Sequence, residues 1–401
     1  MVKKTMVFGF CLFLFPGLLA CEIKVQAGNW NGFNSVTLEN EFLKVTVLPE
    51  KSGRIAEFIY KPEGSNYFLP YQEKSKDNNP LLALAGTVDH NFGGWEDWFW
   101  EVGPQKTRLT YQFLIERKED SVSLVLKRPG GQGNINLERI ITLTERSQVL
   151  KVDVKIKNQT SQEYSYWMHS MVQVGGDFNY DDYNIIPLRK CPEKVPLSLY
   201  NQTEIVSEEM LLKRRFVKDV GPMYLAGQPW WAVGDGKKDF GFGQVIRPES
   251  LIKERTVFYA WCGEEWGKPA MSQEIIFPPV KSGEERIYTI YLIPLLGVSN
   301  LSYLNPEVGI YTSGLEKIQK EGSFELWVIP HNEIKEALLT LSAKDWQVSI
   351  PFKNLIPGKK VVQKIRLPSQ LTRMAELTIN GRWTGPVIDE QFKFFKEKDE
   401  W

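Results

Sequence analysis

Histidine and cysteine are scarce in this 401-residue sequence, which holds three of the first and four of the second. No CxxC pair and no cluster of cysteine with histidine occurs, so the ligand spacing of a structural zinc site is missing. We therefore expect no metal and no cofactor. Cys11 and Cys21 lie at the N-terminus. The other two, Cys191 and Cys262, either form a disulfide, which an exported chain would permit, or remain buried thiols.

The sequence also lacks net charge, with 49 Lys and Arg against 49 Asp and Glu. A protein that binds nucleic acid by neutralising phosphates is usually basic, so no nucleic-acid partner is expected. The motifs GxSxG, HExxH and GxxxxGKS/T and an EF-hand loop are absent too. Aromatic residues are abundant instead, at 12%, and their flat rings suit both β-sheets and the faces of sugars.

The apolar stretch that precedes the body of the chain runs from Met6 to Ala20, after Lys3 and Lys4. Fifteen residues are short for a membrane span, which needs about 20, and the pattern is typical of a cleaved secretory signal over residues 1–20. The ending at Cys21 also resembles the bacterial lipoprotein box, in which that cysteine is lipidated. We expect export to the periplasm or cell envelope, with membrane attachment through a lipid on Cys21; the alternative is an uncleaved N-terminal anchor.

Alternation with period 2, rather than a helical period, runs through the chain. In 150–157 apolar residues alternate with charged ones, as in a half-buried antiparallel strand. Similar runs predict further strands over 43–47, 122–126, 135–143, 257–261, 287–292, 324–328, 346–350 and 361–367. Short helices are expected only over 208–216 and 313–320. Many short strands with few helices predict an all-β protein.

The spacing of these strands indicates two sandwiches. Residues 21–297 are too many for one small sandwich and predict a large domain of packed antiparallel sheets. A looser region over 298–322 is interpreted as a linker. Residues 323–401 carry at least five strand-like runs, which is the size of an immunoglobulin-like sandwich.

The stretch 88–101 combines His90 with acids, aromatics and two glycines. So many polar and aromatic groups predict a loop that lines a pocket, with Trp95 and Trp98 stacking on a ligand and Glu96 and Asp97 binding its hydroxyls. The alternative is a surface loop with its aromatic residues tucked beneath it.

Two further stretches supply candidate site residues. If 164–171 is a strand, Trp167 and His169 share one of its faces, and His169 either points into a pocket or is a satisfied core residue. Acids follow in Glu264, Glu265 and Glu274, the last at the start of an apolar run. The third histidine, His331, is expected in a surface turn.

Several of these segments resemble the galactose mutarotase-like superfamily. The run 38–49 followed by Gly53-Arg54-Ile55 is similar to the start of that family. The region of His90, with its glycines and Trp95, resembles the family's first histidine region, and the turn at Asn158 leading to His169 resembles its second. The segment from Gln273-Glu274 to 282–285 is similar to the family's closing acidic segment.

This resemblance implies a large antiparallel β-supersandwich with a sugar pocket, here followed by the small immunoglobulin-like sandwich. It implies His169, His90 and Glu274 as catalytic residues, with Glu264 and Glu265 competing for the place of the base. The expected substrate-binding residues are Trp95, Glu96, Asp97, Trp98, Trp167, Glu264 and Glu265. Three functions stay open: an enzyme of the aldose 1-epimerase type, a non-catalytic carbohydrate-binding protein, and a structural envelope protein.

Overall fold

The computed structural model describes residues 23–69, 93–99, 110–128, 135–190, 207–218, 221, 223–250, 256–265 and 268–400. Nearly all regular structure in these residues is β-strand, which confirms the all-β prediction. Among them, no helix is long and apolar enough to cross a membrane.

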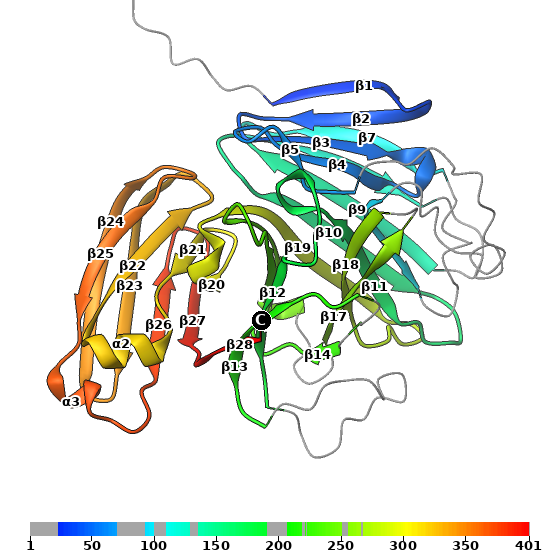
Figure 1. Ribbon diagram of the computed structural model, residues 1–401. Helices are drawn as coiled ribbons and strands as arrows, with labels where there is room; N and C mark the ends of the chain where they lie inside the picture. The colour runs from blue at the N-terminus through cyan, green and yellow to red at the C-terminus, as the bar shows by residue number, and fades with distance from the viewer. Residues whose placement is uncertain are drawn as a thin grey trace, which may run out of the picture.

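Two ten-stranded sheets form the larger part of the molecule (Figure 1). The first large sheet has the order β1-β2-β3-β4-β6-β11-β18-β17-β14, with β5 paired to β4. Its strands are β1 (Lys24–Trp30), β2 (Phe33–Glu39), β3 (Leu43–Leu48), β4 (Arg54–Tyr60), β5 (Ser65–Asn66), β6 (Gly94–Phe99), β11 (Tyr166–Val172), β14 (Met223–Leu225), β17 (Val257–Glu265) and β18 (Lys268–Ile276).

The second large sheet has the order β28-β13-β12-β15-β16-β19-β10-β9-β8-β7. Its strands are β7 (Gln112–Arg117), β8 (Ser121–Lys127), β9 (Ile135–Thr144), β10 (Leu150–Asn158), β12 (Tyr183–Leu188), β13 (Met210–Arg215), β15 (Trp230–Gly234), β16 (Phe240–Ile246), β19 (Glu285–Leu296) and β28 (Glu397–Glu400). Among the described strands, β13 and β28 form the one parallel pair.

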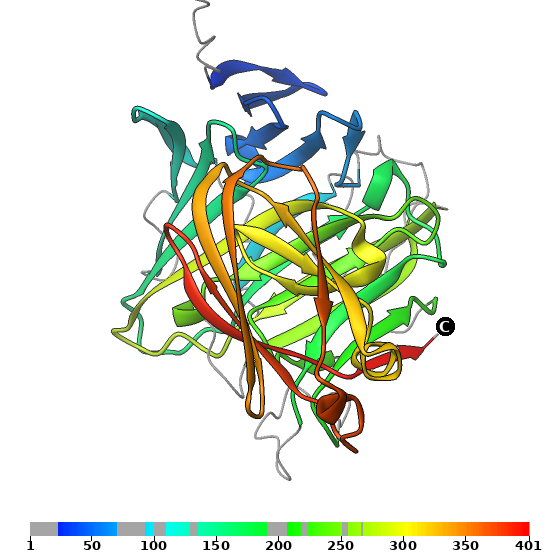
Figure 2. The same cartoon turned by 90° about the vertical axis from the view of Figure 1, so that its left-hand side faces the viewer.

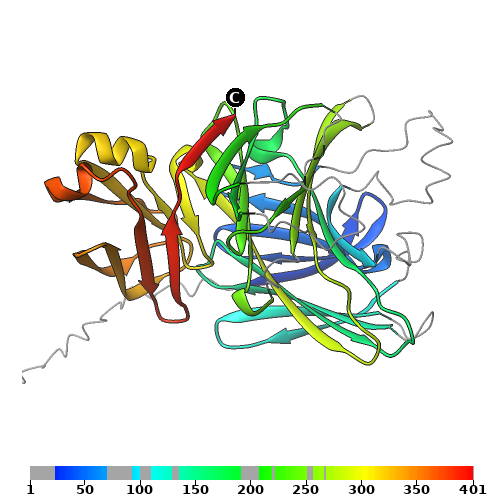
Figure 3. The ribbon, with the colours of Figure 1, turned by 90° about the horizontal axis from the view of Figure 1, so that it is seen from below.

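Two four-stranded sheets make up the C-terminal sandwich, which lies beside the large sheets in Figures 1 and 3 and in front of them in Figure 2. One has the order β20-β21-β22-β25, with β20 (Leu301–Leu304), β21 (Val308–Tyr311), β22 (Ser323–Pro330) and β25 (Val361–Arg366). The other has the order β24-β23-β26-β27, with β23 (Ile334–Ala343), β24 (Trp346–Leu355), β26 (Ile379–Thr384) and β27 (Asp389–Phe394). Within the described ranges, the α-helices are α2 (Leu315–Glu321) and α3 (Ser369–Thr372).

The second large sheet is buried on both faces over much of its width. Because successive side chains of a strand point to opposite faces, Trp231 packs into the core between the two large sheets, whereas its neighbour Trp230 packs against the C-terminal sandwich. Ile186 and Ile185 divide in the same way. The second large sheet therefore lies between two apolar cores, one shared with the first large sheet and one shared with the C-terminal sandwich. The other face of the first large sheet remains for the site described below.

The strands expected from alternation are present, including β10 over the run that begins at Leu150 and β11 over most of 164–171. The helix expected over 313–320 corresponds to α2. The helix expected over 208–216 is wrong, because those residues contain β13, which pairs with β12 on one side and β28 on the other. The domain boundaries stay a prediction; the segment 298–322 contains β20, β21 and α2, and β21 pairs with β22.

The loop expected over 88–101 is corrected where the structure describes it. Residues 94–99 form β6, a fully buried strand between β4 and β11. Its polar residues are accommodated by buried partners from other strands rather than by solvent. Gly94 has a φ of 75°, and a side chain there would clash with the carbonyl of Ile55 in β4.

Candidate functional site

A row of polar side chains crosses the outer face of the first large sheet. In the strand register, Glu96 of β6 stands opposite His169 of β11, His169 opposite Glu274 of β18, and Glu274 opposite Tyr259 of β17. Directly opposite residues of antiparallel strands project from the same face of a sheet. Four strands that are far apart in sequence therefore align one acid, one imidazole, a second acid and a phenol.

The imidazole of His169 lies between the two carboxylates. Its Nδ1 is 3.5 Å from Oε1 of Glu96, and its Nε2 is 4.0 Å from Oε1 of Glu274. All three residues are buried, with exposed fractions of 5%, 5% and 7% for Glu96, His169 and Glu274. The two ring nitrogens thus face different acids, Nδ1 facing Glu96 and Nε2 facing Glu274, so each nitrogen can have its own role in proton transfer.

Arg54 compensates the negative charge of Glu96. Its guanidinium forms a buried ion pair with the Glu96 carboxylate and donates to the carbonyl oxygen of Gly93 at 2.5 Å. Buried charges are tolerated when they are paired and hydrogen-bonded. Arg54, Glu96, His169 and Glu274 therefore form a continuous chain of charged and titratable groups across β4, β6, β11 and β18.

A second buried arginine supports this row from the core side. Arg139 of β9 binds the carboxylate of Asp97 with two nitrogens, and the hydroxyl of Tyr166 donates to the same carboxylate at 2.7 Å. Arg139 also donates to the carbonyl oxygens of Ser52, at 3.1 Å, and Gly53, at 2.6 Å. It thereby ties the second large sheet to the residues directly before Arg54 and directly after Glu96.

The carboxyl of Glu274 is held in an environment that favours its neutral form. Burial is the main cause, and it raises the pKa of Glu274 to about 7, against the opposing effects of nearby His169 and a hydrogen bond from Ser272 at 3.2 Å. Burial and the charge of Glu274 also raise the pKa of Tyr259 to about 12. A carboxyl that titrates near neutral pH is suited to act as a general base.

The raised pKa of Glu274 predicts a specific dependence of stability on pH. The folded state holds the Glu274 proton up to about pH 7, whereas the unfolded state releases it near pH 4.5. Its contribution to stability is therefore fully present below pH 4.5 and is lost as the pH rises through 7. Glu274→Gln should remove this loss. The free energy of unfolding of the variant minus that of wild type should therefore increase by roughly 1–3 kcal/mol from pH 5 to pH 8.

Urea unfolding at several pH values measures this difference. Glu336→Gln serves as the control, because the Glu336 side chain is 77% exposed. Parallel curves for wild type and Glu274→Gln over this range would contradict the prediction. Burial also raises the pKa of Asp182 to about 7, so wild type and variant both lose further stability as the pH rises. This shared loss cancels when the free energy of unfolding of wild type is subtracted from that of Glu274→Gln.

Aromatic side chains lie next to the row on the same face. Trp98 and Trp167 stand opposite each other with ring centroids 6.3 Å apart and an interplanar angle of 24°. The ring of Trp98 is also 5.2 Å from that of His169. Further along the face, Met223, Leu225, Val257 and Ile276 complete an apolar cluster with the two indoles.

Two of the predicted ligand-binding residues face away from His169. Trp95 and Asp97 project from β6 toward the core, on the opposite face from Glu96 and Trp98. Trp95 is fully buried, with the Arg139 guanidinium 4.9 Å from its ring centroid. The predicted pocket shared by Trp95 and His169 is therefore wrong, because β6 is a strand and sends alternate side chains to opposite faces.

The register selects among the three candidate bases. Glu274 stands next to His169, whereas Glu264 and Glu265 lie at the end of β17, opposite Pro269 and Lys268. At about 3.3 Å per residue, Glu264 is about 17 Å along β17 from Tyr259 in the row. His90 and Cys21 lie outside the described residues.

Outside the row, two further expectations can be compared with the structure. His331 is buried rather than in a surface turn, and burial lowers its pKa to about 3. Cys262 is a buried thiol whose Sγ donates to the carbonyl oxygen of Val217. Cys191, its partner in the disulfide alternative, lies outside the described residues.

Sequence reasoning assigned no role to Arg54, Tyr259 or Arg139. A signal for Arg139 exists in hindsight: it occupies an inward position of the alternating run 135–143, where a charge requires a buried partner. Arg54 stands in the Gly53-Arg54-Ile55 segment, which resembles the start of the galactose mutarotase-like superfamily but carries no signal of an ion pair with Glu96. Tyr259 offers no such signal, because its place in the row follows from pairing between β17 and β18.

No protein-family model matches this sequence, and no curated protein matches it. Among solved structures, the chain is similar to a TPR-domain containing protein from Parabacteroides distasonis, at 12% identity and a TM-score of 0.48, over 68% of this chain and 49% of that one. The chain thus spans about half the length of that protein.

The galactose mutarotase-like resemblance recurs among the solved structures. The chain is similar to a galactose mutarotase-like protein from Clostridium acetobutylicum, at 10% identity and a TM-score of 0.48, over 69% of this chain and 99% of that one. It is also similar to a galactose mutarotase related enzyme from Lactobacillus acidophilus, at 11% identity and a TM-score of 0.45, over 65% and 97% of the two chains. At such identities none of these likenesses assigns a role to a residue of this chain.

Proposed function

We propose that this protein binds a sugar at the row of Glu96, His169 and Glu274 and interconverts its anomers. The single observation that carries the proposal is the placement of the His169 imidazole beside two buried carboxylates. Opening a pyranose ring needs a base at the anomeric hydroxyl and an acid at the ring oxygen. Because these two oxygens are bound to the same carbon, the acid and the base must be close neighbours on one face of the protein.

In the proposed reaction, Glu274 removes the proton of the anomeric hydroxyl. The bond between the anomeric carbon and the ring oxygen breaks, the anomeric carbonyl forms, and Nε2 of His169 gives its proton to the ring oxygen. Rotation about the bond next to the carbonyl presents its other face. Ring closure then reverses both proton transfers and yields the opposite anomer, with no net change in protons or electrons.

Glu96 and Arg54 have supporting tasks in this scheme. Glu96 faces Nδ1 of His169 at 3.5 Å and Glu274 faces Nε2 at 4.0 Å, so the two acids orient the ring with Nε2 toward Glu274. The Arg54 guanidinium supplies the counter-charge that a buried Glu96 carboxylate needs. These residues orient the acid without contacting the reacting oxygens.

The alternative is a non-catalytic sugar-binding protein, and the stacked indoles of Trp98 and Trp167 favour it. Such a protein needs aromatic surface and hydrogen-bonding groups but no matched acid and base. Under either function we expect the protein in the cell envelope, and this expectation rests only on the N-terminal signal pattern and Cys21.

The two functions are separated by measuring exchange and binding on the same variants. Exchange between the α and β anomers of glucose, galactose, xylose and mannose is followed by NMR, and binding by calorimetry. An enzyme accelerates exchange of at least one aldose beyond the buffer rate, and a binder gives heat without acceleration. Neither signal with any of the four sugars would contradict both functions.

Under both functions, Trp98→Ala should weaken sugar binding by about 10-fold, because it removes one ring of the stacked pair beside His169. Trp95→Phe is the matched control on the same strand. It changes the core face of β6, so it should lower thermal stability while leaving sugar affinity within twofold. Equal affinities for wild type and Trp98→Ala would place the sugar elsewhere.

A further inference from the structure

Three adjoining pockets form a polar groove where the second large sheet meets the C-terminal sandwich. Their volumes are about 490, 430 and 390 Å³. The first two share Tyr183 and Ser299, and the last two share Asn300, Ser313 and Lys317. None of the residues that line these pockets belongs to the first large sheet, so the groove is separate from the row at His169.

The middle of the groove is held in place by buried contacts. Lys213 of β13 is 5% exposed, and its Nζ donates to the carbonyl oxygen of Ser299 at 2.9 Å and pairs with Glu397 at 3.1 Å. The backbone nitrogen of Ser299 donates to the carboxylate of Asp239 at 2.9 Å. The short 3-10 helix Val298–Asn300 is therefore fixed to β13 through Lys213 and to Asp239, the residue directly before β16. Because Lys213 also pairs with Glu397 of β28, the groove needs no rearrangement to exist.

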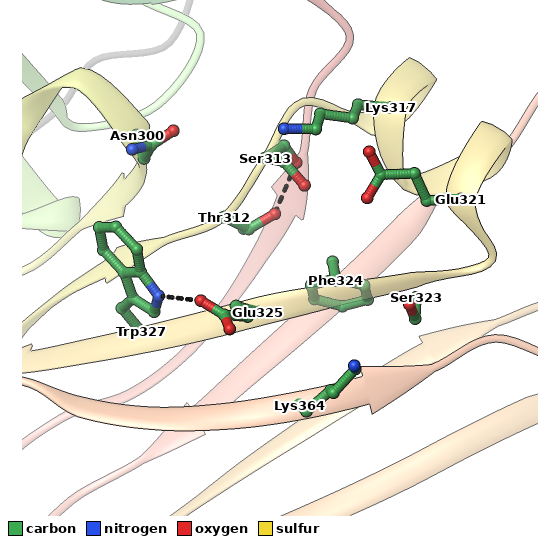
Figure 4. A pocket seen from close by; sticks show the side chains of 10 residues that line it. All are labelled: Asn300, Thr312, Ser313, Lys317, Glu321, Ser323, Phe324, Glu325, Trp327 and Lys364. Atoms are coloured by element: carbon green, nitrogen blue, oxygen red, sulfur yellow. Dashed lines mark hydrogen bonds between the residues drawn. The ribbon is translucent and has the colours of Figure 1, made fainter.

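The groove ends in the pocket drawn in Figure 4, between α2 and the strands β22 and β25. Trp327 stands at one end of this pocket. Its indole nitrogen donates to Glu325 at 3.3 Å, and the ammonium of Lys360 lies 4.0 Å from its ring centroid. The ring is thus fixed in orientation and contributes an aromatic edge to a wall that is otherwise polar.

The charges of the terminal pocket balance. Lys317 and Glu321 line it from α2, and Glu325 of β22 and Lys364 of β25, which stand opposite each other in the strand register, line it from the sheet. Hydroxyl and amide groups complete the lining. A polyanion would be repelled by the acids, and an apolar ligand would leave these donors and acceptors without partners. Closely spaced donors and acceptors of both kinds suit the hydroxyls of a neutral sugar, and the edge of the Trp327 ring offers an apolar contact beside them.

An extended peptide fits this site less well. Peptides that bind to sheets usually add a strand at a free edge. Of the two strands that carry the terminal pocket, β22 is already paired on both sides, with β21 and β25, whereas β25 is the edge strand of this sheet. The pocket lies over side chains of β22, Ser323, Glu325 and Trp327 among them, and beside α2 rather than along that edge. The groove is lined by side chains instead, which is the arrangement that binds hydroxyl groups.

We propose that this groove is a second binding site, which holds a neutral oligosaccharide with one sugar ring against Trp327. Each pocket has the volume range of a small-ligand site, and three in series match a chain of several sugar residues. The site would anchor a glycan chain at a place remote from His169. It does not depend on the function proposed for that residue.

Calorimetric titration with cellohexaose, maltohexaose, xylohexaose and laminarihexaose tests the groove in the full chain. At least one hexasaccharide should bind, and Trp327→Ala should weaken that binding by about 10- to 100-fold. Asn300→Ala should weaken it too, through loss of an amide that lines both of the joined pockets. Trp346→Ala is the matched control, because Trp346 is also a partly buried tryptophan of the C-terminal sandwich but lies on β24, in the other sheet.

His169→Ala separates the two sites, since it should leave hexasaccharide affinity at the groove within twofold. Binding that is abolished by His169→Ala and unchanged by Trp327→Ala would overturn the groove while supporting the site at His169. No heat with any of the four hexasaccharides would overturn it as well. So would preferential binding of dextran sulfate or of an unstructured decapeptide, because the ligand class would then be wrong.

Discussion

Replacing His169 by alanine is expected to slow anomer exchange by about 10²–10⁴-fold, the usual contribution of one acid–base group. Glu274→Gln should cause a loss of similar size, because it removes the base and keeps the shape of the side chain. The two residues act on the same reacting carbon, so the double variant should lose little more than the stronger single one. The measurement is the catalysed rate of α–β exchange by NMR or polarimetry.

The same assay tests the choice of base. Glu264→Gln and Glu265→Gln should keep their exchange rates within about threefold of wild type, because those residues stand at the far end of β17 from the row. Retention of full activity by Glu274→Gln, or its loss in either of the other two variants, would overturn the assignment of Glu274. Circular dichroism of each variant checks that the fold is intact.

The pH dependence of exchange gives an independent check on the roles of these two residues. Activity should rise on a limb near pH 7, where Glu274 loses its proton and becomes a base. Glu96→Gln should change proton donation by His169 rather than proton removal by Glu274, because the carboxylate that faces Nδ1 of His169 is gone. The limb that belongs to Glu274 should then persist while the other limb of the profile moves.

Arg139→Met is expected to be the most destabilising single change in the large sheets, at about 3–5 kcal/mol. Arg139 and Asp97 are 0% and 2% exposed at their side chains, so removing the guanidinium leaves a buried carboxylate without its counter-charge. The double variant Arg139→Met with Asp97→Asn should recover part of this loss, because no charge is then left in the core. Urea unfolding measures all three proteins.

An exposed ion pair provides the matched control for this experiment. Arg382 and Asp389 form a two-pronged contact on the C-terminal sandwich, with side chains 53% and 50% exposed. Arg382→Met should leave the free energy of unfolding close to that of wild type, because solvent screens such pairs. A loss below 1 kcal/mol for Arg139→Met would show that Asp97 finds another partner or that water enters the core.

The alternating apolar pattern was sufficient to predict most of the strands. Runs such as 150–157 place apolar side chains on one face, and that periodicity is a local property that any window of the sequence displays. Alternation also predicted which side chains of β11 share a face. Met168 packs into the core, while Trp167 and His169 lie on the other face. The helix expected over 208–216 failed because pairing on both edges of β13 outweighs local helix propensity.

The sequence by itself determined that the chain is built of β-strands and that His169 and Glu274 belong among the candidate site residues. Only the tertiary structure decided which acid faces the histidine and which polar residues of β6 are structural. Glu96 and Asp97 are neighbours with the same chemistry, yet the first faces His169 and the second faces Arg139. The physical reason is that the role of a buried charged group depends on the group it pairs with. Each of these partners comes from a strand that is distant in sequence, and only strand pairing or sheet packing brings it close.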